Sequence, residues 1–175
     1  MDPGFRRGEN NRIGNVMEPS PLKSPAFDPA RLPVRSGSGY PQKFKAPVAA
    51  RQWSALGTHA GLTQFGVNLV ELPPGCWSSQ RHWHSREDEL IYILEGELVL
   101  ATDEGEQLLS AGHAAGFPAG KANGHHLINR SGRKARFLAM GSRIVGDECH
   151  YPDVDLHVVS APEGDIWTDK TGKPY

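Results

Sequence analysis

The chain has 175 residues, a formal net charge of −1 and a hydrophobic fraction of 38%. This length supports one domain with a core of moderate size, and the 20 Gly and 14 Pro favour a turn-rich β protein over a helical bundle. Residues 1–51 hold nine Lys or Arg against four acidic residues, a net charge of +5, so the total of −1 leaves −6 on the rest. This balance excludes the broad basic face of a nucleic-acid-binding protein, and we expect a small-molecule partner.

The cysteine content and the apolar runs indicate the cellular compartment of the protein. Cys76 and Cys149 form no CxxC pair, and two cysteines are too few for a disulfide scaffold. No apolar segment follows the arginines near the start, and no run approaches the roughly 18 apolar residues that cross a bilayer. We therefore expect a cytoplasmic protein that does not bind membranes.

The first 45 residues differ in amino-acid composition from the rest of the chain. They contain seven of the 14 prolines and few large apolar side chains, so they cannot offset the entropy of folding on their own. We expect residues 1–45 to form a Pro-rich, largely irregular N-terminal arm. Met17 follows a polar stretch without periodicity, and either Met1 or Met17 is expected to be the translation start.

From residue 46, short apolar runs alternate with turn residues, which is typical of β-strands. The sequence predicts strands at 63–72, 89–94, 97–102, 107–109, 114–117, 125–129 and 135–140, with a hairpin turn at DEGE, 103–106. Strands of this number and length close into a sandwich or small barrel, here residues 46–142. Residues 143–175 have one predicted strand, at 155–159. They are expected to form an extension packed on the barrel or on a partner subunit.

Two histidines precede the strand predicted at 89–94. Side chains alternate along an extended chain, so His82 and His84 share one face, where two imidazoles can clip a metal ion. An acidic cluster at 87–89 can supply a third ligand, and Glu89 is the best placed because a strand begins there. An HxH pair on a surface strand can also be incidental.

A second pair of histidines, His125 and His126, follows the Pro–Gly break at 118–120. Only one of the two can face inward. His125 would share a face with Leu127, and His126 would share the other face with Ile128. The apolar pattern alone fits either register.

The spacing of these residues follows two motifs. Residues 75–96 carry Gly75, His82, His84, Glu89 and Gly96, and residues 112–129 carry Gly112, Pro118, Gly120, His125 and Asn129. In this order they resemble the two motifs of the cupin superfamily, G(X)5HXH(X)3–4E(X)6G and G(X)5PXG(X)2H(X)3N. The chain departs from them by one additional residue before His82 and two before His125. The spacing to Asn129 in the second motif selects His125 over His126.

This resemblance covers residues 60–142 and implies an all-β fold, a double-stranded β-helix or jelly-roll barrel with extended N- and C-terminal arms. Such barrels hold one divalent metal ion through three histidines and a glutamate, here His82, His84, Glu89 and His125. These ligand types suit Fe, Mn, Zn, Ni or Co and leave one or two coordination positions open. The chain is similar to small bacterial single-domain cupins, a group for which a fold and a site carry over but no substrate.

The expected function is that of a divalent-metal-dependent enzyme acting on a small polar molecule, a sugar or an organic acid, by isomerase, lyase or dioxygenase chemistry. Tyr92 is a candidate for proton transfer, because it faces inward with Leu90 and Leu94 if their apolar side is the inner one; a core tyrosine is the alternative. Arg81 and Lys121 could bind an anionic group at the barrel mouth. A non-catalytic small-molecule-binding or sensor module is the alternative function.

Self-association is a separate expectation. Barrel edges need covering, and the Pro-rich arms at both ends are long enough to reach a neighbouring chain. We therefore predict a homodimer.

Overall fold

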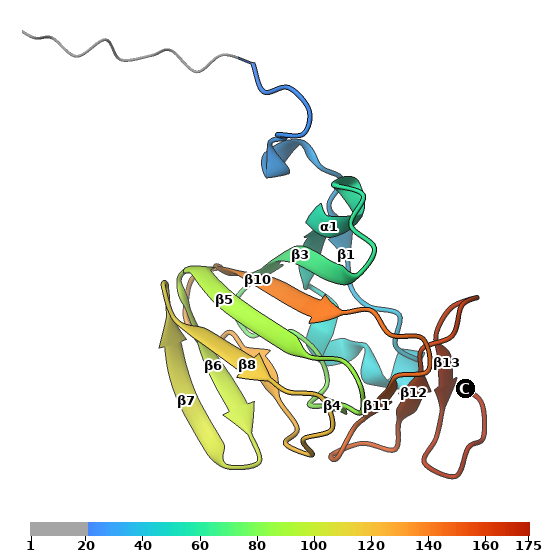
Figure 1. The fold of residues 1–175 in the computed structure, drawn as a ribbon. Helices are drawn as coiled ribbons and strands as arrows, with labels where there is room; N and C mark the ends of the chain where they lie inside the picture. The colour runs from blue at the N-terminus through green and yellow to red at the C-terminus, as the bar shows by residue number, and fades with distance from the viewer. Residues whose placement is uncertain (1–20) are drawn as a thin grey trace, which may run out of the picture.

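The structure, a computed structural model, describes residues 21–175, so the start of the N-terminal arm and Met17 lie outside the described residues. Most of the regular structure is β (Figure 1). One short helix, α1 (Leu56–His59), and three 3-10 turns, η1 (Pro29–Arg31), η2 (Gln42–Phe44) and η3 (Ala46–Val48), are the exceptions within these residues. None of the helices in residues 21–175 has the length and apolar character needed to cross a membrane.

The strands of residues 21–175 are β1 (Arg35–Ser36), β2 (Gln52–Ala55), β3 (Phe65–Leu72), β4 (Trp83–His84), β5 (Glu89–Glu95), β6 (Glu97–Thr102), β7 (Gly105–Ser110), β8 (Ala114–Phe117), β9 (His126–Ile128), β10 (Ala135–Ser142), β11 (Glu148–His150), β12 (His157–Val159) and β13 (Ile166–Thr168). All eight predicted strands are present, with bounds that coincide or differ by at most two residues at either end. The predicted hairpin joins β6 to β7, where Thr102 pairs with Gly105. Five strands were not predicted: β1, β2, β4, β11 and β13.

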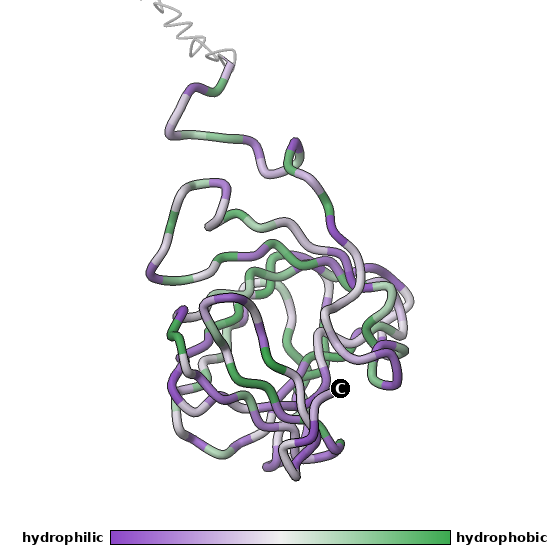
Figure 2. The backbone as a smooth tube through the Cα atoms, turned by 90° about the vertical axis from the view of Figure 1, so that its right-hand side faces the viewer, coloured by the Kyte–Doolittle hydropathy of each residue, from purple (hydrophilic) through white to green (hydrophobic). Residues whose placement is uncertain are grey.

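Three antiparallel sheets make up the jelly roll. One has the order β1-β2-β3-β10-β5-β8, a second β7-β6-β9, and a third β13-β12-β11-β4. The main core lies between the first two sheets, where Ile93 and Phe137 of the first face Leu98 and Leu127 of the second. Figure 2 shows apolar stretches inside the body and polar stretches in the turns around it. The fold is therefore the all-β barrel that the sequence predicts.

A second apolar cluster joins the two ends of the described chain. It consists of Tyr40, Phe44 and Val48, which precede the barrel strands, and Cys149, Tyr151, Leu156 and Val158, which follow them. The rings of Tyr40 and Trp167 meet edge to face at 5.3 Å. The C-terminal extension thus packs on the barrel of the same chain through the β4–β11 pairing. Before β1, the chain contacts α1, where the ring centroids of Phe27 and His59 lie 4.6 Å apart, and residues 21–26 lead away from the body (Figures 1 and 2).

The prediction for the inner face of β5 is wrong. Ile91 and Ile93 are buried in the core, whereas Leu90, Tyr92 and Leu94 are 40–43% exposed on the outer face of the sheet. Both faces of this strand are apolar, so alternation does not distinguish them. Tyr92 therefore points away from the barrel interior and cannot transfer a proton there.

Candidate metal centre

The four proposed metal ligands come from three segments that the barrel brings together. Glu89 is the first residue of β5, His84 lies in β4, and His82 directly precedes β4. His82 and His125 form an antiparallel bridge, in which each backbone N–H donates to the carbonyl oxygen of the other, at 3.1 and 2.8 Å. This bridge holds the two histidine clusters of the sequence against each other.

Side chains from these segments converge on one carboxylate oxygen. Oε2 of Glu89 lies 3.6 Å from Nε2 of His82, 3.7 Å from Nε2 of His84 and 2.9 Å from Nε2 of His125. Ligand atoms bound to one ion at about 2.1 Å lie roughly 3.0–3.4 Å apart, whether the geometry is octahedral or tetrahedral. The three observed distances lie just outside this range, so small side-chain movements would complete the geometry, and the donor types suit a divalent transition-metal ion. The ligand atoms of His82, Glu89 and His125 lie within 4.8 Å of one another, and His84 adjoins this group through its contact with Glu89.

His126, the alternative to His125, has a different environment. Its ring packs edge to face against Trp77, and its Nδ1 lies 3.1 Å from the carbonyl oxygen of Ser79. His125 instead stacks on Phe117 and directs Nε2 at Glu89. His125 is thus the histidine that approaches Glu89, although both histidines line the same cavity, so the expectation that only one of them faces inward is wrong. Asn129 is fully buried and donates to the carbonyl oxygens of Leu72 and Arg133.

The protonation states of the cluster suit a cation. Burial alone would raise the pKa of the Glu89 carboxyl, but hydrogen bonds from His125 and His82 hold this pKa well below its usual value. Burial lowers the pKa of His125 despite the carboxylate beside it, which keeps the imidazole neutral. Burial also acts to lower the pKa of His82, yet the carboxylate of Glu89 raises it overall, so a bound cation would displace a proton there.

Asp147 supports this cluster from behind and was not identified in the sequence. Its side chain is almost fully buried, and Oδ2 accepts a hydrogen bond of 2.6 Å from Nδ1 of His84. Oδ1 accepts from the backbone N–H of Arg86 and of Glu87 and from the hydroxyl of Ser85. Since His84 donates from Nδ1, its Nε2 is left as the metal-binding atom.

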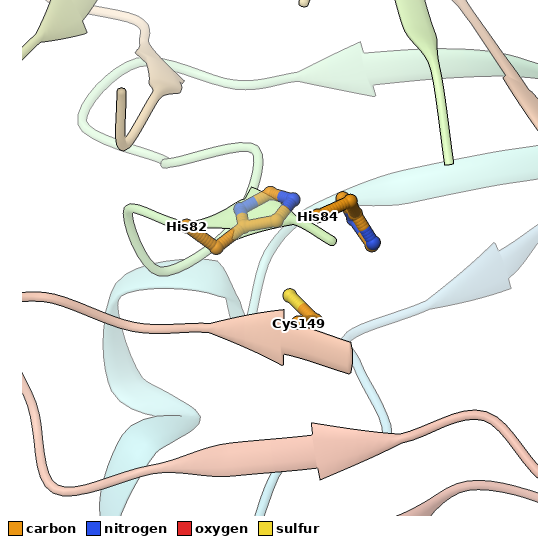
Figure 3. Close-up of side chains that lie close together, drawn as sticks. All are labelled: His82, His84 and Cys149. Carbon is orange, nitrogen blue, oxygen red and sulfur yellow. The ribbon is translucent and has the colours of Figure 1, made fainter. Parts of the chain in front are cut away.

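Cys149 also lies beside the histidines. Figure 3 shows its sulfur approaching His82 and His84 from β11, and one ligand atom of each of the three residues lies within 4.8 Å of the others. Metals bind the thiolate form of cysteine, but burial raises the pKa of Cys149 well above its usual value. A bound cation would act against this effect and favour the thiolate, so Cys149 is a further candidate ligand beside the two histidines.

A cavity of about 300 Å³ opens beside the cluster and runs into the barrel. Its wall combines apolar core residues with polar groups that include Arg51, Asn68, His82, Glu89, His125 and His126. The Arg51 guanidinium donates to the carbonyl oxygens of Gly37 and Ser78 through three of its N–H groups. Two of its five N–H groups have no acceptor within residues 21–175, and Arg51 was not identified from the sequence.

Of the two cations expected at the barrel mouth, Arg81 is already paired. Its guanidinium contacts Asp153 at 2.5 and 2.7 Å and also contacts Asp103, so its charge is compensated by two carboxylates. Lys121 lines a smaller cavity next to His84 and Glu89. Tyr92 lines neither cavity.

The comparisons with known proteins agree with this architecture. A family model described as "Cupin domain" matches residues 68–141. The crystal structure of a sugar phosphate isomerase from a cupin superfamily of Silicibacter pomeroyi is 42% identical, with a TM-score of 0.83 over 86% of this chain and 96% of that chain. A structure from Acidithiobacillus ferrooxidans, whose name also refers to sugar phosphate isomerase, is 26% identical, with a TM-score of 0.66 over 73% of this chain and 81% of that one.

A more distant structure shares the fold alone. This predicted oxalate decarboxylase from Thermotoga maritima is 21% identical, with a TM-score of 0.53 over 68% of this chain and 99% of that one. No curated protein matches the sequence.

Proposed function

Because the chain belongs to the cupin superfamily, we propose that it is a divalent-metal-dependent isomerase of a small sugar or sugar phosphate. The metal ion would be held by His82, His84, Glu89 and His125. The observation that carries the proposal is the convergence of three imidazole nitrogens on the Glu89 carboxylate, at the wall of a cavity large enough for a small molecule. The similarity to a sugar phosphate isomerase from Silicibacter pomeroyi supports the choice of substrate class.

When bound, a divalent ion polarises a carbonyl or hydroxyl oxygen and stabilises the negative charge that develops on it. Three neutral imidazoles and one carboxylate suit Fe, Mn, Zn, Ni or Co and leave the ion a net positive charge. The hydrogen bond from His84 to Asp147 fixes one ring of this set. The apolar part of the cavity wall limits the access of water to the site.

Two residues of the cavity have roles in this proposal. An aldose–ketose isomerisation removes a proton from one carbon and returns it to its neighbour, so it needs a base in the cavity. His126 suits this role, because burial lowers its pKa and because Nδ1 donates to the carbonyl oxygen of Ser79, which leaves Nε2 as an acceptor. The two free N–H groups of Arg51 would bind the phosphate or another anionic substituent.

The proposal is tested by metal analysis and turnover of sugar phosphates on matched variants. We expect Glu89→Ala and His82→Ala to lose both the metal ion of the barrel site and turnover while the circular dichroism spectrum is retained. His126→Gln should retain the metal and lower kcat by about 100-fold or more, the usual contribution of a general base. Arg51→Gln should raise KM for a phosphorylated sugar more than for its unphosphorylated counterpart. The control is His59→Gln, which changes an exposed histidine of α1 that lines neither of the two cavities.

Two outcomes decide against this function. Turnover by a metal-free Glu89→Ala protein would refute the metal dependence. The alternative of a binding or sensor module requires that sugar phosphates raise the melting temperature of the metal-loaded protein without any conversion to product.

A further inference from the structure

A second group of potential metal ligands lies in the C-terminal sheet. In the antiparallel pair β11–β12, His150 stands opposite His157. Glu148 is two residues before His150 on the same strand, so the three side chains project from one face of the sheet. Two imidazoles and a carboxylate are thus fixed by strand pairing rather than by loop conformation.

Distances within this group match those of ligands that share one ion. Oε2 of Glu148 lies 3.1 Å from Nε2 of His157 and 3.8 Å from Nε2 of His150. All three ligand atoms lie within 4.8 Å of one another. Ligands bound tetrahedrally at about 2.0–2.1 Å are separated by roughly 3.4 Å, which falls between the two observed distances. Small rotations of these three side chains would therefore bring their ligand atoms to the separations of a tetrahedral metal site.

The group is separate from the barrel cluster. Along the pairing of β11 with β4, Cys149 stands opposite His84 and His150 stands opposite Trp83. Because side chains alternate, Cys149 and His84 face the barrel cluster, whereas His150 and Trp83 face the other side. The Trp83 ring stacks on His150 with centroids 4.2 Å apart and an interplanar angle of 16°, which fixes the imidazole plane.

We propose that Glu148, His150 and His157 bind a second divalent ion, with Zn²⁺ as the best match. Imidazole nitrogens select borderline transition metals over Mg²⁺ and Ca²⁺, which prefer oxygen ligands only. The side chains of His157, His150 and Glu148 are 23%, 35% and 49% exposed, so the ion exchanges with solvent and keeps at least one open position. Bound zinc ties β11 to β12 and thereby stabilises the C-terminal sheet against local opening.

The experiment is a calorimetric titration of the full chain with ZnCl₂, combined with zinc-dependent thermal melting. The wild type should bind two zinc ions. The double variant His150→Gln/His157→Gln should bind one and should lose the part of the zinc-dependent rise in melting temperature that belongs to the second site. Glu148→Gln should weaken this site by about 10-fold or more while changing only one exposed side chain, which keeps the test valid if the double variant does not fold.

Matched variants separate this site from the barrel site. Glu89→Gln should abolish the barrel site and leave the second one intact, so a failure of the proposed enzymatic function leaves the second site measurable. The control His59→Gln/His113→Gln removes two exposed histidines elsewhere and should keep both sites. An unchanged zinc stoichiometry in both the double variant and Glu148→Gln would overturn the proposal. It would show that Glu148 and His157 form a hydrogen bond without binding an ion.

Discussion

At the scale of single residues, the buried carboxylate of Asp147 determines how one imidazole of the candidate centre is presented. It accepts from Nδ1 of His84 and from two backbone N–H groups, and these hydrogen bonds lower its pKa although burial acts to raise it. Asp147 thus stays ionised and stabilises the imidazole that points Nε2 at the metal position. The residue touches no substrate and is a positioning residue.

We predict that Asp147→Asn weakens metal binding by about 10- to 100-fold, the usual effect of changing a group that orients a ligand. The amide keeps the size of the side chain but loses the charge that favours donation from His84. Competition with a chelator of known affinity measures the change. Asp165→Asn, an exposed loop change, serves as the control, and equal affinities in the two variants would contradict the role of Asp147.

Residue spacing allowed the four candidate ligands to be selected, because their order along the chain follows motifs whose geometry the barrel imposes. Asp147 and Arg51 could not be found in this way. Asp147 meets His84 across 63 residues, and Arg51 meets Ser78 across 27, in contacts that no local pattern encodes. Tyr92 was misplaced because β5 is apolar on both faces, so alternation does not reveal which face is inside.

At the scale of elements, the turn between β5 and β6 depends on Gly96. Its φ is +76°, and a Cβ atom there would lie 3.0 Å from the Cβ of Ala135 and from the carbonyl oxygen of Lys134. Gly75 has a nearly identical φ of +78° but open space around it. A comparison of alanine substitutions at the two glycines therefore separates two contributions to the loss of stability: the left-handed backbone conformation and the steric contact of the added Cβ atom.

We expect Gly75→Ala to lower the free energy of unfolding by about 1–2 kcal/mol, the cost of a left-handed conformation for a residue with a Cβ atom. Gly96→Ala adds a clash with a backbone carbonyl and should cost about 2–4 kcal/mol. Urea denaturation of the two variants measures the difference. Equal losses would show that the contact with Ala135 relaxes freely.

In residues 21–175, all strands of six or more residues were predicted, whereas of the shorter ones only β8, β9 and β12 were. β3, β5, β6 and β10 have six to eight residues, enough for an apolar run to stand out between turn residues. β1 and β4 have two residues each, and β11 and β13 have three. Such segments carry no periodicity, and only their pairing with distant strands makes them extended.

At the scale of the whole molecule, the outer face of the largest sheet supports the expected homodimer. Tyr92 of β5 pairs with Leu138 of β10, which pairs in turn with Leu69 of β3, and Met140 similarly joins Leu90 to Val67. These side chains form a continuous apolar surface, with Leu90, Tyr92 and Leu94 40–43% exposed. We expect a surface of this kind to be an interaction site, which an isologous pair of sheets would cover symmetrically.

We predict a dimeric mass in sedimentation velocity at micromolar concentration, and a monomeric mass for the double variant Leu90→Glu/Tyr92→Glu. A charge on this face would have to be buried at the interface without a partner, which is unfavourable. The control is Leu108→Glu, which places the same charge on β7, where Leu108 is 57% exposed outside this sheet. A monomeric wild type, or dissociation by the control as well, would refute an interface at this face.

The second apolar cluster links the detachment of the chain segment before the barrel to the detachment of the segment after it. Tyr40 and Phe44 lie before the barrel strands, whereas Tyr151 and Trp167 lie after them, so neither end can detach without removing the packing partners of the other. The two ends therefore form one cooperative unit that opens and closes together. Tyr151 also lies 5.8 Å from the ring of His82. Opening of this unit would expose the flank of the candidate metal centre, so we expect the joined ends of the chain to govern how long an ion stays bound there.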